Sequence, residues 1–206
     1  MSKTIPIITE SEETLIFREL FNQTVSPHRY SKRLRNATMV ALMLDAGLRV
    51  GEVVSLQVPD LCTLNEPVHT LIISKENSKN KTSRSIPLTN RLVELVKEMN
   101  EHIWRFEPGR NPSWAFCSNS WQPPLTTRQV ERIIKAISKI AINREIHPHV
   151  LRHTFATRLM RTSNIRIVQA LLGHKSLTST QAYTHPNNID LKTAIGTLEQ
   201  GKLPRN

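Results

Sequence analysis

Hydrophobic residues recur along most of the chain at the three- and four-residue spacing of helices, so the sequence predicts a mainly helical protein. An acidic segment at 8–13 precedes apolar positions on one helical face, which predicts a first helix ending near residue 23. The mostly apolar segment from Asn36 to Ala46 predicts a buried helix that Gly47 stops, and a short helix is expected from about Gly51 to Leu56.

The middle of the chain changes to the two-residue period of β-strands. Residues 69–74 and 84–88 predict an antiparallel hairpin whose polar tip carries Lys75, Lys79 and Lys81. Helical patterns then return, and the expected helices span residues 89–103, 126–140, 148–161, 164–172, 177–184 and 189–199. The expected fold class is α+β, mainly α, with a small antiparallel sheet and hairpin.

Length and composition favour one globular domain over residues 1–206, because no composition shift divides the chain. The core is expected at about 8–187, with a C-terminal tail at about 188–206. Cys62 and Cys117 lie far apart, so neither a disulfide scaffold nor a cysteine zinc site is expected. A membrane span and a signal peptide are not indicated either, which predicts a cytoplasmic protein.

Positive charge points to a polyanionic partner. Lys and Arg number 28 against 17 Asp and Glu, for a formal net charge of +11. Nucleic acid is the first expectation and an anionic membrane surface the second. Aromatic residues are only 5%, which disfavours stacking on single strands and favours double-stranded DNA held by its phosphates. Residues 24–35 are interpreted as a basic connector whose candidate contacts are His28, Arg29, Lys32, Arg33 and Arg35.

Several basic residues and one tyrosine could act together on a phosphodiester. Arg49 follows Gly47, and a surface ion pair with Glu52 is its simpler interpretation. His149 and Arg152 share a helical face, and His174 directly follows a helix-ending glycine. Tyr183 lies nine positions beyond His174. Guanidiniums can clamp the non-bridging phosphate oxygens while a tyrosine hydroxyl attacks phosphorus, although a lone tyrosine is more often a core residue.

A metal centre is a weaker interpretation of the same histidines. His149 and His153 have a spacing that could bind zinc, but Arg152 lies between them and would repel a cation. The segment also contains no acidic residue, and the chain has no phosphate-binding loop of the ATPase type. We therefore expect no metal and no cofactor.

Four segments in order resemble the catalytic domain of the tyrosine recombinases, also called phage integrases. They are GLRVGE at 47–52, SRSIPLT at 83–89, HPHVLRHTFATRLM at 147–160 and LLGHKSLTSTQAYTH at 171–185. The resemblance runs from about Ile8 to about Leu198. It implies a site-specific recombinase that cleaves and rejoins duplex DNA through a covalent 3′-phosphotyrosine.

The resemblance also implies a role for each matching residue. Arg49 and Arg152 would hold the scissile phosphate. His149 would bind the phosphate and manage the nucleophile's proton, and His174 would add a hydrogen bond. Tyr183 would be the nucleophile, with Glu52 orienting its neighbours.

A lysine of the hairpin would protonate the leaving 5′ oxygen. Family hairpins place that lysine eight residues before the proline of the last strand, which selects Lys79 from its distance to Pro87. Lys75 and Lys81 remain alternatives for this role, or contacts to the DNA backbone.

The resemblance further implies an assembly, a homotetramer on DNA made of two dimers, with a monomer as the free form. The tail at 188–206 would pack on a neighbouring protomer, or fold back on its own domain. An N-terminal DNA-clamping domain, common in the family, is not expected here, as in the short fimbrial phase-switch invertases. An accessory DNA-binding protein could compensate, and the active protein would associate with the nucleoid. The alternatives are a DNA-binding regulator without catalysis and a type IB topoisomerase-like relaxing enzyme.

Overall fold

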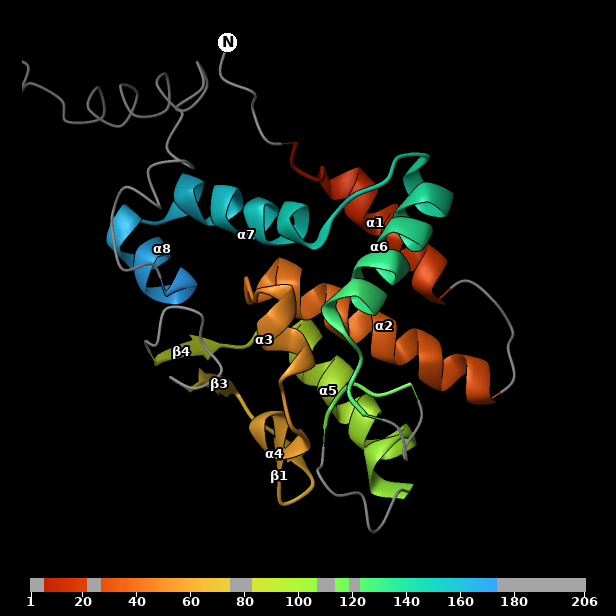
Figure 1. Cartoon of the computed structure of the whole chain (residues 1–206). Helices are drawn as coiled ribbons and strands as arrows, with labels where there is room; N and C mark the ends of the chain where they lie inside the picture. The colour runs from red at the N-terminus through yellow and green to blue at the C-terminus, as the bar shows by residue number, and fades with distance from the viewer. Residues whose placement is uncertain (1–5, 22–26, 75–82, 107–113, 119–122, 174–206) are drawn as a thin grey trace, which may run out of the picture.

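Helices dominate the structure, and two short antiparallel strand pairs accompany them (Figure 1). The computed structural model describes residues 6–21, 27–74, 83–106, 114–118 and 123–173, without the side chains of 27–29 and 106. The helices are α1 (Glu10–Phe21), α2 (Pro27–Asp45), α3 (Val50–Val54), α4 (Val58–Leu61), α5 (Asn90–His102), the 3-10 helix η1 (Trp104–Phe106), α6 (Thr127–Ile142), α7 (Pro148–Thr162) and α8 (Ile165–Leu172). The strands are β1 (Cys62–Thr63), β2 (Glu66–Pro67), β3 (Thr70–Ile73) and β4 (Arg84–Pro87).

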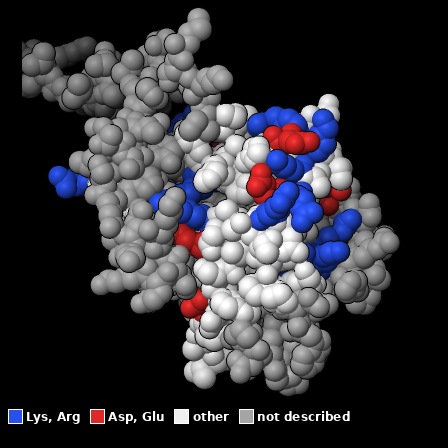
Figure 2. All heavy atoms as spheres, in the orientation of Figure 1, with Lys and Arg blue, Asp and Glu red and all other residues white. Residues whose placement is uncertain are grey.

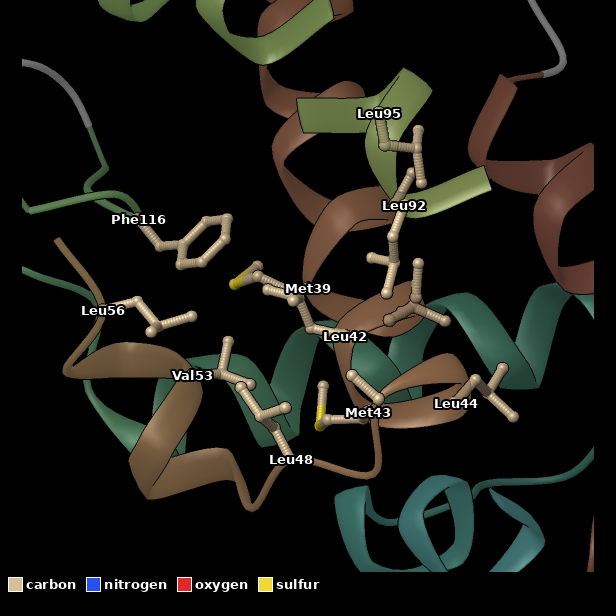
Figure 3. Packing of buried hydrophobic residues seen from close by; sticks show 14 of the residues in the cluster. Met39, Leu42, Met43, Leu44, Leu48, Val53, Leu56, Leu92, Leu95 and Phe116 are labelled. Atoms are coloured by element: carbon tan, nitrogen blue, oxygen red, sulfur yellow. The ribbon is translucent and has the colours of Figure 1, made fainter. Parts of the chain in front are cut away.

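The core is organised around α2, which packs against α1, α3, α5 and α7. Its segment from Thr38 to Leu44 is buried on every side, as the apolar run from Met39 to Leu44 predicts for a central helix. Figure 3 shows Met39 beside Phe116, with Leu92 of α5 approaching α2 from another side. The predicted buried helix from Asn36 to Ala46 is therefore confirmed, although α2 begins earlier.

The strands β3 and β4 form the predicted antiparallel pair, with Leu71 opposite Ile86 and Ile73 opposite Arg84. Alternation places Leu71, Ile73 and Ile86 in the core. Arg84 shares that buried face, so a guanidinium enters the interior of the domain.

Local capping accounts for the helices that the sequence predicted well. Thr89 accepts a hydrogen bond from the backbone N–H of Leu92 at the start of α5. Thr126 and Gln129 form a capping box at the start of α6. Asn164 caps α8, and Pro148 occupies the first turn of α7.

The structure corrects the interpretation of residues 24–35 as a connector. The helix α2 begins at Pro27, so Lys32, Arg33 and Arg35 lie on a helix and not on a loop. Tyr30 and Leu34 lie one turn apart and face the core. This pair is the apolar signal that the many charged neighbours obscured.

Three small elements were not predicted from the sequence, the 3-10 helix η1 among them. The helix α4 and the hairpin of β1 and β2 follow α3 directly. The hairpin turns at Leu64 and Asn65, both with positive φ, in place of the usual Asn-Gly pair. Its sequence therefore lacked a recognisable turn signal.

The expected fold class, mainly helical with a small antiparallel sheet, is confirmed. The predicted helices at 177–184 and 189–199 lie outside the described residues. Within the described part of the chain, no helix is both long and apolar enough to cross a membrane.

Candidate functional site

The site begins at the turn between α2 and α3. Gly47 ends α2 with a φ of +62°, and a Cβ there would overlap the ring of Phe155 on α7. Two residues later, Arg49 is the N-cap residue of α3, in an extended conformation. The turn therefore requires glycine, and it places the chain just before Arg49 against the neighbouring helix α7.

The carboxylate of Glu52 is the centre of the site and is only 2% exposed. It accepts hydrogen bonds from Arg49 Nη1 at 3.0 Å and from the Arg49 backbone N–H at 2.8 Å. Arg84 reaches it from β4 with both terminal nitrogens, at 2.9 and 2.7 Å. Arg152 Nη1 lies 3.8 Å from Glu52 Oε2. One carboxylate thus organises guanidiniums from three separate elements.

Two helix ends hold the buried guanidinium of Arg152. Its Nη1 donates to the carbonyl of Gly47, and its Nη2 donates to the carbonyl of Leu172 at 2.8 Å. These carbonyls lie where α2 and α8 end, and helix ends leave carbonyl groups without partners inside the helix. They carry partial negative charge, so they favour a cation at this position.

The electrostatics of the cluster favour an anion. Burial raises the pKa of Glu52, but Arg84, the Arg49 backbone N–H and Arg152 outweigh burial and hold that pKa below its ordinary value. Glu52 is therefore ionised at neutral pH. Against this one negative charge stand three guanidiniums, so two positive charges remain in excess. Arg49 is the most exposed of the three, with 19% of its side chain accessible, and is best placed to meet an incoming anion.

Residues of α7 extend the site. His149 lies in the first turn of that helix and is exposed, whereas Arg152 one turn later is buried. Figure 2 shows Lys or Arg side chains, with acidic ones below them, on the surface between the positions of α7 and α3. These are the helices that carry Arg152 and Glu52.

Several predicted site residues lie outside the described residues. They are Lys75, Lys79 and Lys81 of the hairpin tip, together with His174 and Tyr183. The strands β3 and β4 on either side of the hairpin tip are described, and so is Gly173, the C-cap of α8, which directly precedes His174. The structure thus brings Arg49, Glu52 and Arg152 together and leaves the roles of the other residues as predictions.

The candidate DNA contacts near residue 30 separate into different environments. Lys32 is exposed on α2, whereas Arg35 is buried and donates to the carbonyl of Cys117 at 2.7 Å. The side chain of Arg29 lies outside the described residues. Arg33 is half-buried. Of these residues, Lys32 therefore offers the clearest surface charge, and Arg35 has a structural contact.

Arg84 was missed by the sequence analysis. The signal was present, because the alternation of β4 places residue 84 on the same face as Ile86. An arginine at an inward position of a strand indicates a buried hydrogen-bond acceptor, such as a carboxylate. That partner, Glu52, lies 32 positions away in the sequence, so it could not be identified from local spacing.

A metal site is not apparent in the described part of the chain, where no three His, Cys, Asp or Glu side chains gather to hold an ion. The sequence of α7, which carries His149 and His153, contains no acidic residue. The donors of the cluster, guanidiniums around a single carboxylate, suit an anion and not a cation.

Comparison with known proteins gives the family. The model of the phage integrase family matches residues 16–189. The tyrosine recombinase XerC of Listeria monocytogenes serotype 4a (strain HCC23) is 34% identical over 177 residues, which cover 85% of this chain and 57% of that protein. A tyrosine recombinase of Pseudothermotoga lettingae is 36% identical over 171 residues, covering 82% of this chain and 56% of that protein.

Solved structures of recombinases share the fold of this chain. The XerA recombinase aligns with a TM-score of 0.73 at 24% identity and covers all of this chain and 68% of its own. The XerH recombinase, in a post-cleavage complex with a palindromic difH substrate, aligns with a TM-score of 0.72 at 25% identity over 96% of this chain and 54% of its own. The chain belongs to the phage integrase family, as its motifs predicted. It spans somewhat more than half the length of the curated relatives that it matches.

Proposed function

We propose that this chain is a site-specific DNA recombinase that cleaves and rejoins duplex DNA through a covalent bond between Tyr183 and a 3′ phosphate. The observation that carries the proposal is the cluster of Arg49, Arg84 and Arg152 around Glu52. It combines an excess of positive charge with fixed geometry, which is what a pentavalent phosphorus transition state requires. Membership of the phage integrase family supports the same reaction.

The reaction exchanges one phosphodiester for another. The oxygen of Tyr183 attacks phosphorus while the bond from phosphorus to the 5′ oxygen breaks, and Lys79 supplies a proton to that leaving oxygen. A 5′ hydroxyl of a second strand then attacks the phosphotyrosine, which releases Tyr183. The phosphoester bonds broken and formed are of similar energy, so the exchange needs no energy source.

Positive charge lowers the barrier to the attack. A tyrosine has an ordinary pKa of roughly 10, so it is a poor nucleophile at neutral pH unless its anion is stabilised. Arg49 and Arg152 hold the non-bridging oxygens and neutralise charge that develops at phosphorus. His149 and His174 add hydrogen bonds, and His149 accepts the phenolic proton.

The partner is double-stranded DNA, and the active assembly is a homotetramer of two dimers. The structural neighbours support the DNA partner, because the XerH and Tn1549 integrase structures were solved as complexes with DNA. The catalytic core occupies residues 8–187, and the tail at 188–206 packs on a neighbouring protomer. Further contacts to the DNA backbone come from Arg29, Lys32, Arg33, Lys75 and Lys81. An accessory protein assists DNA binding. The protein acts at the nucleoid in the cytoplasm.

Covalent trapping tests the proposal. Labelled duplexes from either side of the gene, with nicks that prevent religation, are incubated with the protein and boiled in detergent. We expect a labelled protein band that is absent for Tyr183→Phe. The chain has two tyrosines, and Tyr30 donates a hydrogen bond to Glu98 at 2.6 Å, so Tyr30→Phe is a matched control that should retain the band.

The possible outcomes separate the alternatives. A band that persists in Tyr183→Phe would contradict the assigned nucleophile. DNA binding without any adduct would favour a regulator that lacks catalysis. Relaxation of supercoiled plasmids of any sequence, without joining of two sites, would favour a topoisomerase-like enzyme.

A further inference from the structure

The Arg84 side chain joins two parts of the site that are far apart in sequence. Its two terminal nitrogens bind both oxygens of Glu52, and its side chain is only 4% exposed. A Cβ placed on Gly173 would lie 3.1 Å from Arg84 Cδ and 3.3 Å from Arg84 Nη1. The guanidinium therefore lies between Glu52 on α3 and the turn that ends α8.

Charge is the first reason to assign this residue a role. Without Arg84, the buried carboxylate of Glu52 would retain only Arg49 and Arg152 as cationic partners among the described residues. It would then compete with a phosphate for the same two guanidiniums, because both are anions that accept bidentate hydrogen bonds. With Arg84 present, each oxygen of Glu52 already has a short hydrogen bond from Arg84.

Geometry is the second reason. Glu52 fixes Arg49 through both the side chain and the backbone N–H. The carbonyl of Leu172 fixes Arg152, and Gly173 follows it directly. Arg84 binds the first support, Glu52, and lies close to Gly173, the residue that follows the second. A single side chain of the hairpin is therefore adjacent to both groups that hold the other arginines.

We propose that Arg84 is a positioning residue that neutralises Glu52 and thereby leaves Arg49 and Arg152 available to bind a tetrahedral oxyanion. The assignment rests on the proposed function for the identity of that oxyanion, a DNA phosphodiester. Arg84 itself does not touch the substrate. It acts through the carboxylate that it occupies and through the α8 turn that it supports.

The test titrates tungstate, a stable tetrahedral dianion, into the whole chain and follows binding by calorimetry. Arg84→Met should weaken tungstate binding on the order of tenfold, less than the roughly hundredfold or greater loss expected for removal of a direct donor. Arg84→Met/Glu52→Gln should bind more tightly than Arg84→Met, because the competing carboxylate is gone along with its partner. Arg84→Lys keeps the positive charge but loses the two parallel hydrogen bonds to Glu52, so its tungstate affinity should lie between those of the wild type and Arg84→Met.

The Arg144–Glu12 pair provides a matched control. Its guanidinium also binds both oxygens of a glutamate, at 2.8 and 2.9 Å, and joins segments 132 positions apart. The hydrogen bonds of Arg144 go to Glu12 and to the carbonyl of Ile7, neither of which belongs to the Glu52 cluster. Arg144→Met should leave tungstate binding unchanged, even if the melting temperature falls.

Stability and site effects are separable. If Arg84→Met does not fold, the double variant still reports, because removing both members of a buried ion pair is often tolerated when removing one is not. The inference would be overturned if the wild type, Arg84→Met and the double variant all bound tungstate with equal affinity. It would also be overturned if the double variant bound no better than Arg84→Met.

The trapping assay distinguishes this inference from the proposed function. Wild-type protein that forms the Tyr183 adduct but binds no tungstate would overturn the role of Arg84 and leave the recombinase proposal standing. If the tungstate affinities follow the predicted order but no adduct forms, the role of Arg84 stands and the recombinase proposal is overturned. When both hold, the rates of adduct formation at saturating protein should follow the tungstate order.

Discussion

Substitution of Gly47 by alanine tests the turn on which the site is built. The residue has a φ of +62°, and its Cβ would overlap two ring carbons of Phe155. The left-handed backbone costs an L-residue about 1–2 kcal/mol. Forcing an extra carbon into a packed contact costs about 1–3 kcal/mol. We therefore expect Gly47→Ala to lower the free energy of unfolding by roughly 2–5 kcal/mol.

The same substitution should damage the site beyond its effect on stability. The Gly47 carbonyl accepts a hydrogen bond from Arg152, and Phe155 lies one turn after Arg152 on α7. Relief of the overlap moves either the turn or α7, and both motions change that hydrogen bond. Tungstate affinity should thus fall for the fraction of Gly47→Ala protein that remains folded.

Chemical denaturation checks the magnitude, and another glycine provides the control. Gly51 is not among the glycines with positive φ, and a Cβ placed on it would meet nothing within 4 Å, so Gly51→Ala should be neutral or stabilise by about 0.5–1 kcal/mol. In Gly47→Ala/Phe155→Leu the smaller side chain should recover part of the packing cost. A Gly47→Ala loss of no more than about 1–2 kcal/mol would refute the steric argument, because the backbone alone accounts for that much.

Two further measurements concern the supports of the fold. The hydrogen bonds from Arg144 lower the pKa of Glu12 from an ordinary 4.5 to about 2, although burial opposes them. The pair therefore stabilises the native state above pH 4.5, and this contribution is lost as the pH falls toward 2. Acid unfolding of Glu12→Gln should accordingly depend less on pH in this range than that of the wild type, and parallel curves would contradict the assignment. Asn164→Ala removes the acceptor for the backbone N–H groups of Arg166 and Ile167 at the start of α8, so thermal denaturation should show a loss of about 1 kcal/mol, and an unchanged melting temperature would show that this cap is dispensable.

The elements that could be predicted from the sequence are those with local signals. The capping threonines before α5 and α6 and the glycine after α2 mark helix ends through contacts within one turn. The period of two in 69–74 and 84–88 marked the hairpin strands in the same way. The start of α2 was not predicted because its first turns are charged, and Tyr30 and Leu34 alone were too few to indicate a helical face.

The site was predicted in part, for a related reason. The pairing of Arg49 with Glu52 is a contact within one helical turn, so spacing alone suggested it. The simpler interpretation of that pair as a surface contact is wrong, because Glu52 is buried and binds Arg84 as well. The Arg84 contact spans 32 positions and the Arg152 contacts with Gly47 and Leu172 span 105 and 20, and no local pattern encodes such distances.

Most groups that surround Glu52 lie at the ends of elements. Arg49 caps the start of α3, Arg84 begins β4, and the carbonyls that hold Arg152 lie at the ends of α2 and α8. Ends of helices and strands are where backbone groups lack partners, so they can bind charged side chains without breaking regular structure. They are also positioned only when every element has docked. Correct packing of α2, α3, α7, α8 and the hairpin is therefore a condition for a competent anion site, and an incompletely folded chain cannot present one.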